Sequence, residues 1–279
     1  MLYDLHTHTN ASDGILTSRE LIDKAVQTGL AGIAVTDHDT VAGIQEALDY
    51  QKKYDSRLEV IPGIEMNTEN EDCEVHILGY YIDHRDSILC NRLKELKESR
   101  LNRAVEMVKK LRAMGYNITF EQIRRIAQND LIARPHIARA LVQNNNVFSI
   151  KEAFDKLIGR GKPAYVPRYK FLPEEALNMI KSSGGIAVLA HPGLIKNQLL
   201  IDQVIAAGIE GIEIYYPEHK PEQIEKYIAL ALRHNLLITG GSDYHGLSGE
   251  KVASQLGCCG ISAEQMQKIR KYYGEKRQK

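Results

Sequence analysis

Residues 32–53 have the sequence GIAVTDHDTVAGIQEALDYQKK, and this stretch decides the fold. The apolar run from Gly32 to Thr36 predicts a buried strand, and Val41 to Lys53 has the spacing of an amphipathic helix. A strand followed directly by a helix is typical of βα units around a parallel sheet. The polar pair Asp37-His38 follows the strand, so this unit carries chemically competent side chains at the carboxyl end of its strand.

The same alternation continues on both sides of this stretch. Toward the N-terminus, Leu2 to Leu5 predicts a strand, and Thr17-Ser-Arg-Glu20 is a capping box that begins a helix ending near Gly29. Five further strands are predicted at Leu58 to Ile64, Glu74 to Tyr81, Ile186 to Ala190, Gly211 to Tyr216 and Leu236 to Gly240. The pattern therefore predicts the α/β class, as a distorted (βα)7 TIM-like barrel of parallel strands.

Between the fourth and fifth predicted strands the pattern becomes helical. A long polar amphipathic helix is predicted from Ser87 to Gly115, followed by shorter ones at Phe120 to Gln128, His136 to Asn144 and Lys151 to Ile158. We therefore predict two domains, a barrel formed by residues 1–84 and 171–279 and a mainly helical insertion formed by residues 85–170. The insertion has 19 basic and 8 acidic residues, although the whole chain has no net charge. This basic surplus favours an anionic substrate, whereas the neutral whole argues against binding of long duplex nucleic acid.

The composition predicts a soluble protein of the cytoplasm. Hydrophobic residues make up 43% of the 279 residues, which is enough for a substantial core. The N-terminal sequence has no signal-peptide pattern, and no long uncharged apolar segment follows it. Four cysteines without a CxxC pair are expected to be reduced thiols. We expect a monomer with no membrane partner.

Imidazole and carboxyl side chains gather where the predicted strands end. These residues are His6, His8, Asp13, His38, Glu65, His76, His191, Asp243 and His245. A barrel brings the carboxyl ends of its strands together, and a His-x-His pair in a strand presents both imidazoles on one face. Imidazole together with carboxylate suits Mn, Fe or Zn, and this many ligands fits two or three divalent metal ions.

Each of these residues, taken alone, also has an ordinary structural explanation. His76 in an apolar strand could be a hydrogen-bonded core residue, and Asp13 in Ser-Asp-Gly could be a turn residue. Asp37 could cap the following helix. The placement of the whole set at the ends of most strands is what favours a metal centre over these explanations.

Four separated motifs resemble those of the polymerase and histidinol phosphatase (PHP) superfamily. They are Asp4-Leu-His6-Thr-His8 with Ser12-Asp13-Gly14, Val35-Thr-Asp37-His38-Asp39, Pro62-Gly63-Ile-Glu65 and Gly241-Ser-Asp243-Tyr-His245, and Ala190-His191-Pro192 adds a further element. Their order and spacing agree with the family from end to end of the chain. The resemblance implies a metal-dependent phosphoesterase on a TIM-like barrel.

The resemblance also implies how the ligands are divided among the ions. The residues His6, His8, Glu65 and Asp243 resemble the ligands of one metal, Glu65 with His76 and His191 those of a second, and Asp13, His38 and His245 those of a third. Asp37 resembles a residue that orients an imidazole. In the mechanism that we infer from this ligand set, two adjacent cations activate a shared water as hydroxide, which attacks the phosphorus.

The insertion is expected to bind the substrate. In Ala133-Arg134-Pro-His136, the proline suits the first turn of a helix, so that Arg134 and His136 lie at a helix N-terminus, which attracts phosphate. Further candidates are Arg100, Asn102, Arg103, Arg160 and Lys162. This cluster, with Lys162-Pro-Ala-Tyr165-Val-Pro, resembles the PHP subgroup of nucleoside 3′,5′-bisphosphate phosphatases and 5′→3′ exoribonucleases acting on short RNA, and not the histidinol phosphatases.

Two other functions are open at this point. An amidohydrolase would also place a His-x-His pair on the first strand of a metal barrel, but Glu65 and the Asp243/His245 pair favour phosphoester chemistry. A metal-stabilised RNA-binding module without catalysis is the second alternative. The complete set of ligands disfavours it, because a module that only binds has no need of an intact catalytic centre.

Overall fold

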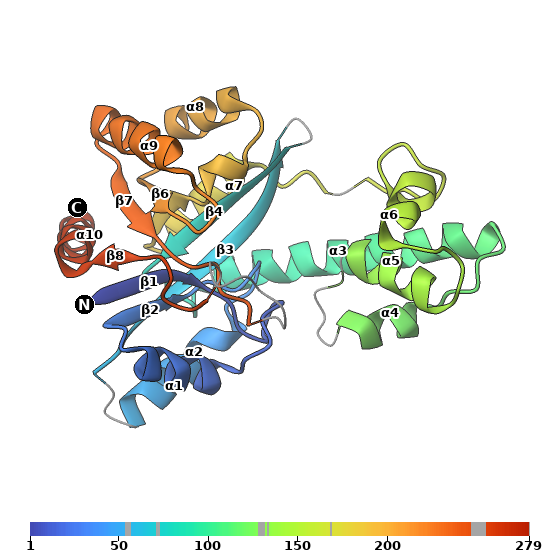
Figure 1. Cartoon of the computed structure of the whole chain (residues 1–279), viewed down its shortest axis with the longest axis horizontal. Coiled ribbons are helices and arrows are strands. Elements are labelled where there is room, and N and C mark those ends of the chain that lie inside the picture. Colours follow the sequence, from blue (N-terminus) through green and yellow to red (C-terminus); the bar gives the residue numbers. More distant parts are fainter. Residues whose placement is uncertain are drawn as a thin grey trace. The chain divides into compact units, whose positions relative to one another are not determined.

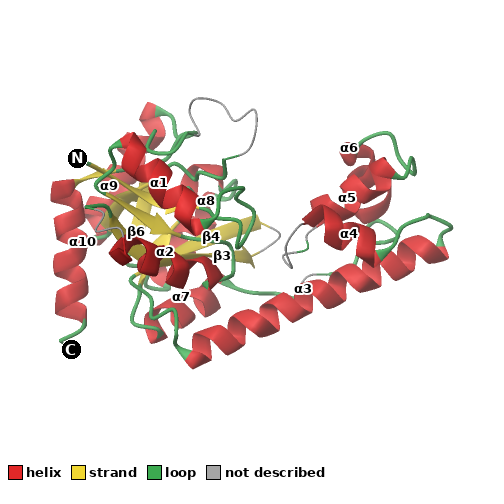
Figure 2. Cartoon of the chain, turned by 90° about the horizontal axis from the view of Figure 1, so that it is seen from below, coloured by secondary structure: helices red, strands yellow, loops and turns green. Residues whose placement is uncertain are grey.

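The chain forms two compact units in the computed structural model, which describes residues 1–53, 57–70, 73–127, 132, 134–167, 169–246 and 255–278. The barrel unit comprises Met1–Cys90 and Lys170–Lys279, and the insertion unit comprises Asn91–Tyr169. The division falls a few residues inside helix α3 (Ser87–Ala113), whereas the sequence-based boundary lies before this helix, where the strand pattern stops. Figure 2 shows α3 as one long helix.

A single sheet of eight strands forms the centre of the barrel unit, in the order β7-β6-β5-β4-β3-β2-β1-β8. The strands are β1 (Leu2–Thr7), β2 (Gly32–Val35), β3 (Glu59–Asn70), β4 (Cys73–Tyr80), β5 (Ile186–Leu189), β6 (Gly211–Tyr215), β7 (Leu237–Gly240) and β8 (Ile261–Ser262) (Figure 1). Tyr244, shortly after β7, forms a parallel bridge with Thr7 at the end of β1. The sheet therefore curls into a nearly closed barrel, which confirms the predicted TIM-like α/β fold.

The prediction that every strand of the barrel is parallel is wrong at β4. This strand is antiparallel to both β3 and β5. Only two residues separate β3 from β4 in the sequence, whereas a parallel pair needs a crossover of a dozen residues or more. The strand count is also larger than the predicted seven, because two residues in β8 are too few to produce a recognisable alternation.

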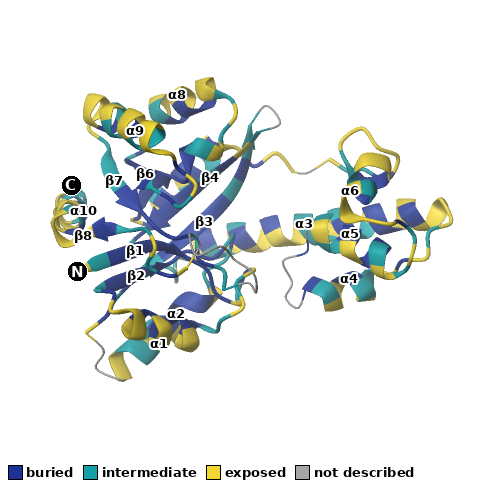
Figure 3. Cartoon of the chain, in the orientation of Figure 1, coloured by how far each residue is buried: buried dark blue, intermediate teal, exposed yellow. Residues whose placement is uncertain are grey.

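Helices cover the outside of the barrel. Helices α1 (Ser18–Thr28) and α2 (Ala42–Lys53) pack on each other, and α2 also contacts β2 and β3. Helix α7 (Pro173–Ser182) packs on β3, β4 and β5, α9 (Pro221–His234) on β6 and β7, and α10 (Ala263–Lys276) on β1, β7 and β8. Helix α8 (Gln198–Ala206) follows the short 3-10 turn η2 (Pro192–Leu194). Figure 3 shows the strands buried and the outer sides of α1, α8 and α9 exposed.

The predicted start and stop signals of α1 act as expected. The Thr17 side chain accepts a hydrogen bond from the Glu20 backbone, and the Glu20 side chain accepts one from the Thr17 backbone. Gly29 ends the helix with a left-handed φ of 78°, which glycine adopts without steric cost. These local signals fix the length of the helix and so the place where the chain enters β2.

The insertion unit is helical and has a hydrophobic core of its own. Besides the distal part of α3 it contains α4 (Phe120–Ala127), α5 (Arg134–Gln143), α6 (Ile150–Ala153) and the π-helical turn η1 (Phe154–Ile158). Buried Leu111, Ile123, Leu141 and Ile158 pack together in its core. The predicted helices are therefore confirmed, while Gln128, at the end of one of them, lies outside the described residues.

A helix that crosses a lipid bilayer must be both long and apolar. Within the described ranges, no helix is both long enough and apolar enough to cross a membrane. None of the four cysteines forms a disulfide.

Candidate metal centre

The nine residues predicted as metal ligands lie together at one end of the barrel. Seven of them lie in or shortly after strands β1, β2, β3, β5 and β7, and Asp13 lies in the loop after β1. His76 comes from the antiparallel strand β4, where it pairs with Asn67 of β3. Because side chains alternate along a strand, His76 lies on the same face as Glu65, two residues before Asn67. The reversed strand therefore still delivers its imidazole to the centre.

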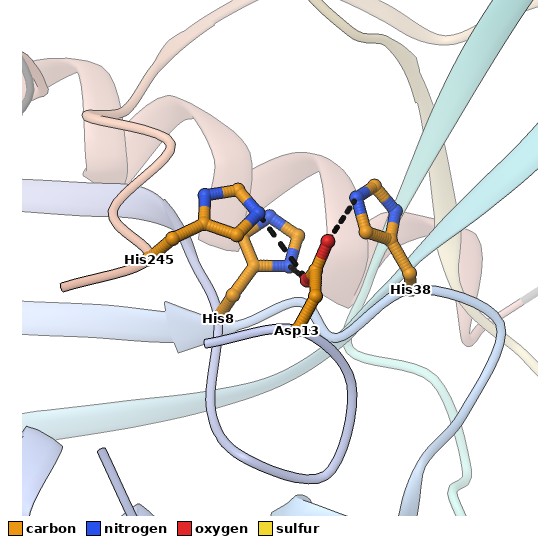
Figure 4. Close-up of side chains that lie close together, drawn as sticks. All are labelled: His8, Asp13, His38 and His245. Atoms are coloured by element: carbon orange, nitrogen blue, oxygen red, sulfur yellow. Dashed lines mark ion pairs between the residues drawn. The ribbon is translucent and has the colours of Figure 1, made fainter. Parts of the chain in front are cut away.

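Three groups of side chains have potential ligand atoms within 4.8 Å of one another. The first consists of His6, His8, Glu65 and Asp243, the second of His38, Glu65 and His76, and the third of His8, Asp13, His38 and His245 (Figure 4). The first group is the set that the family resemblance implied. The second contains His38 where the resemblance implied His191, although His191 Nε2 also lies 3.0 Å from Glu65 Oε1.

Glu65 lies at the centre of the cluster and is completely buried. Its Oε2 atom lies 3.2 Å from His6 Nε2 and 2.9 Å from His38 Nδ1. Its Oε1 atom lies 2.8 Å from His76 Nδ1 and 3.0 Å from His191 Nε2. His8 Nε2 also lies 3.4 Å from Oε2, so the two oxygens face different sets of imidazoles, as a carboxylate that bridges two cations would.

The third group is more open to solvent than the first. Asp13 Oδ1 lies 3.2 Å from His245 Nε2, and Asp13 Oδ2 lies 3.7 Å from His38 Nε2 (Figure 4). The Asp13 side chain is 44% exposed, whereas His8 is fully buried. His8 belongs to two groups, but a neutral imidazole has only one nitrogen lone pair for a ligand. Since His8 Nε2 lies 3.0 Å from Asp243 Oδ1, we place His8 with the first group.

Buried polar atoms without a hydrogen-bond partner converge at this centre. They are His6 Nε2, both ring nitrogens of His8, His38 Nδ1, Glu65 Oε2, His191 Nδ1 and Asp243 Oδ1. Leaving such an atom without a partner costs about 1–3 kcal/mol of stability each. Divalent cations would satisfy the atoms of this set that have a free lone pair, and a mixed imidazole and carboxylate set fits Mn, Fe or Zn. The residues present therefore fit a multinuclear metal centre.

Burial and neighbouring charges shift the pKa values of several of these side chains in opposite directions. Burial lowers the pKa of His38, but the negative charges of Glu65 and Asp13 outweigh it and raise this pKa to about 10. Burial likewise opposes protonation of His245, yet the adjacent Asp13 raises its pKa to about 9. For Glu65, burial raises the pKa, but the charges of His38 and His6 hold it well below its usual range. Without cations, protons on His38 and His245 therefore balance part of the negative charge of the carboxylates.

Three buried side chains that support the centre were missed by sequence analysis. Glu213 contacts the His6 ring with Oε1, and its Oε2 accepts a hydrogen bond from the His191 backbone. Asp4 accepts hydrogen bonds from Ser242 and Gly257, and the Tyr216 hydroxyl donates to Asp243 Oδ2 at 3.1 Å. The available signal was a single acidic residue inside a buried strand, at Asp4 in β1 and at Glu213 in β6.

The expectation that Asp37 orients an imidazole is wrong. Its carboxylate accepts hydrogen bonds from the Thr9 backbone and hydroxyl, each at 2.7 Å, and from the Ser12 hydroxyl at 2.6 Å. These contacts fix the loop that carries Asp13. Asp37 therefore supports the centre through that loop, because Thr9 and Ser12 occupy both of its carboxylate oxygens.

Two of the predicted ligands have an unusual backbone conformation. His191 has a φ of 25° and Asp243 a φ of 54°, in the left-handed region that costs non-glycine residues about 1–3 kcal/mol. Hydrogen bonds around them offset this cost, because the His191 backbone N–H donates to Glu213 Oε2 and the Ser242 backbone N–H donates to Asp4 Oδ1. Backbone strain of this kind is concentrated at functional sites.

The candidate substrate-binding residues all lie in the insertion unit. Arg134 begins α5 and His136 lies in its first turn, as predicted, and the Arg134 guanidinium lies over the Phe154 ring at 5.6 Å. Arg103 donates a 2.8 Å hydrogen bond to the Val166 carbonyl, which gives it a structural role. The remaining candidates are Arg100 and Asn102 on α3 and Arg160 and Lys162 after η1. Ala133 of the same motif lies outside the described residues.

The PHP domain family model matches residues 4–207, which covers all of the ligand positions except Asp243 and His245. The chain belongs to the PHP domain family. Among curated relatives, the chain is 36% identical to the 5′-3′ exoribonuclease Rnm of Escherichia coli over 88% of this chain and 85% of that protein. It is also 36% identical to the 3′,5′-nucleoside bisphosphate phosphatase of Chromobacterium violaceum, over 87% of this chain and 86% of that protein.

Solved structures agree with this PHP assignment. A predicted metal-dependent phosphoesterase from Bifidobacterium adolescentis has a TM-score of 0.77 and 31% identity, covering 96% of this chain and 94% of that chain. A protein of Chromobacterium violaceum described as an amidohydrolase, solved with bound sulfate and no metal, has a TM-score of 0.79 and 33% identity over 99% and 97% of the two chains. The phosphoesterase names of the curated relatives place this PHP protein among the hydrolases of phosphoric ester bonds.

Proposed function

We propose that this PHP protein is a metal-dependent phosphoesterase that hydrolyses nucleoside 3′,5′-bisphosphates, the 5′ ends of short RNA, or both. The observation that carries the proposal is the convergence of unpartnered imidazole and carboxylate atoms around Glu65. The names of the two relatives at 36% identity support the nucleotide substrate class. Two or three divalent ions, Mn, Fe or Zn, would be held by the nine predicted ligands.

The side chains of the centre have different tasks in this proposal. His6, His8, Glu65 and Asp243 would hold one ion, Glu65 with His76 and His191 a second, and Asp13, His38 and His245 a third. Bound cations would polarise the phosphate oxygens and lower the pKa of a water molecule. Tyr216 keeps Asp243 Oδ2 occupied, so that Asp243 Oδ1 remains directed at His6 and His8.

Exposure indicates the side from which a substrate reaches the centre. The His6 and Glu65 side chains are fully buried, whereas Asp243 is 21% exposed and His245 is 18% exposed. Together with the half-exposed Asp13, these residues border the solvent-facing side. A phosphate ester would therefore approach over Asp13, Asp243 and His245, whereas His6 and Glu65 are shielded from water.

The basic residues of the insertion would bind the part of the substrate that is not hydrolysed. Arg134 and His136 at the N-terminus of α5 are our first candidates, because a helix N-terminus and a guanidinium both favour phosphate. Arg100, Asn102, Arg160 and Lys162 are further candidates. The second phosphate of a bisphosphate, or the next phosphate of an RNA chain, would be their ligand.

A substrate panel tests the proposed function. The purified full chain, stripped with chelator and reloaded with Mn²⁺, should hydrolyse adenosine 3′,5′-bisphosphate or a 5′-phosphorylated RNA oligomer far faster than histidinol phosphate or an aryl phosphate. Equal rates on all of the phosphate esters would contradict the nucleotide specificity. Faster turnover of a cyclic amide would favour the amidohydrolase named among the similar structures. RNA that is bound but left intact with Mn²⁺ present would favour a non-catalytic binding module.

A further inference from the structure

Glu213 is a buried acidic residue whose side-chain hydrogen-bond partners, within the described part of the chain, are two predicted metal ligands. It sits in the apolar strand β6 and has no exposed surface. Its Oε1 and Oε2 atoms lie 3.0 Å and 3.3 Å from His6 Nδ1, and Oε2 accepts a 2.8 Å hydrogen bond from the His191 backbone. Among the described residues, its ion-pair partner is His6, with no lysine or arginine in range.

Burying such a carboxylate is unfavourable in free energy. Removing a carboxylate from water costs several kcal/mol unless its hydrogen bonds and charge partners compensate. Its neighbours along β6, Ile212 and Ile214, are buried aliphatic residues, so the strand itself has no need of a charged side chain at this position. The packing of β6 therefore does not explain an acidic residue here, whereas its two partners do, because both are predicted metal ligands.

We propose that Glu213 is a positioning residue that sets the proton position of His6 and holds the backbone of His191, and this proposal rests on the metal-dependent function above. Glu213 faces His6 Nδ1 with both carboxylate oxygens, and Oε2 also accepts from the His191 backbone, so Nδ1 is the nitrogen that donates to it. In the metal-loaded protein, the Nε2 lone pair of His6 would then be directed at the space beside Glu65 Oε2 and Asp243 Oδ1, which lie 3.2 Å and 3.3 Å from Nε2. This is the protonation state that a ligand requires.

The substitution Glu213→Gln separates this role from simple packing, because glutamine has nearly the same shape. Its amide has one acceptor oxygen and one donor nitrogen. The backbone N–H of His191 can only donate, so the amide oxygen must stay on that side. The amide nitrogen then faces His6 Nδ1, which has to accept, and the hydrogen moves to His6 Nε2. The variant should therefore fold but present the wrong nitrogen to a cation.

Glu210 offers a matched control. It immediately precedes β6, and its Oε2 accepts a 2.9 Å hydrogen bond from the backbone of Ala187 in β5, as Glu213 does from His191 after the same strand. Its other oxygen pairs with Lys276 and Tyr272, both outside the metal centre. Glu210→Gln thus removes a comparable carboxylate from the same strand connection without touching a predicted ligand.

The experiment measures Zn²⁺ affinity by chelator competition in the full chain, together with the protonated nitrogen of His6 in the Zn²⁺-loaded protein by ¹⁵N NMR. The His6 signals are assigned by their absence in a His6→Asn variant. We expect Glu213→Gln to bind Zn²⁺ about 10–100-fold more weakly, with the hydrogen on Nε2. Glu210→Gln should retain the wild-type affinity and the hydrogen on Nδ1.

Several results would overturn the proposal. One is a Glu213→Gln variant with wild-type Zn²⁺ affinity and the hydrogen still on His6 Nδ1. Another is an equal loss of Zn²⁺ affinity in Glu210→Gln. Both results would leave the phosphoesterase proposal intact. Absence of Zn²⁺ binding by the wild type would remove both proposals together. If Glu213→Gln does not fold, Glu213→Asp provides the test. Aspartate keeps two acceptor oxygens, so the proposal requires the hydrogen to stay on His6 Nδ1.

Discussion

At the residue scale, the centre depends most on Glu65, because among the described residues it alone faces imidazoles from four different parts of the chain. Glu65→Gln keeps the shape and removes the charge and one acceptor. We expect both metal content and turnover of a nucleotide substrate to fall, with turnover down by roughly 10²–10³-fold or more. Metal content by plasma mass spectrometry and the initial rate check this. A variant that keeps full metal and full activity would contradict the bridging role.

Protons and cations compete for the same imidazoles, which gives a prediction about pH. Burial disfavours the charged forms of His38 and His245, but the neighbouring carboxylates raise their pKa values to about 10 and about 9, so both are protonated at neutral pH without metal. Mn²⁺ binding must then release protons, and its apparent affinity should rise as pH rises from 6 to 8. Calorimetry in two buffers with different ionisation enthalpies counts the protons. A binding enthalpy independent of the buffer would contradict this prediction.

At the element scale, strands β1 and β7 approach closely at the site, and a glycine permits the approach. A Cβ atom added at Gly241 would lie 2.4 Å from both the Cβ and the backbone nitrogen of His6. Gly241→Ala should therefore destabilise the protein by about 1–3 kcal/mol or more and displace His6 or Asp243 from the centre. Urea denaturation and Zn²⁺ content measure the two effects.

The matched control for this substitution is Gly274→Ala in α10, where an added Cβ meets nothing within 4 Å. That change should leave Zn²⁺ content unaltered and raise stability slightly, because alanine favours a helix over glycine. Equal behaviour of the two variants would show that the contact between the two strands does not matter for the site.

The elements also show what the sequence could and could not predict. The βα alternation and the capping box of α1 are local patterns, so the positions of most strands and helices were predictable. The direction of β4 depends on the length of its connection to β3, which the strand pattern alone does not include. Glu213 could not be assigned a role, because its partner His6 is 207 residues away and no spacing links them. Asp37 was misjudged because a carboxylate after a strand can turn toward either an imidazole or a loop.

At the scale of the whole molecule, two units with separate cores carry different kinds of side chain. The barrel unit supplies the imidazoles and carboxylates of the metal centre, and the insertion, with its own packed core, carries a surplus of basic residues. A substitution in one unit can therefore change one kinetic constant without changing the other. Loss of chemistry should lower kcat, whereas loss of substrate binding should raise KM.

Arg134→Ala tests this division of labour. If Arg134 binds the phosphate that is not hydrolysed, KM for adenosine 3′,5′-bisphosphate should rise about 10–150-fold, the equivalent of a hydrogen bond to a charged group worth 1.5–3 kcal/mol. The rate on an aryl phosphate, which has no second phosphate, should change little.

Arg139→Ala, on the exposed side of the same helix, is the control and should leave both values near wild type. Because Arg134 also lies over Phe154, the unfolding temperature of each variant is measured as well. A parallel loss on both substrates would assign Arg134 to the packing of the insertion instead of to the substrate.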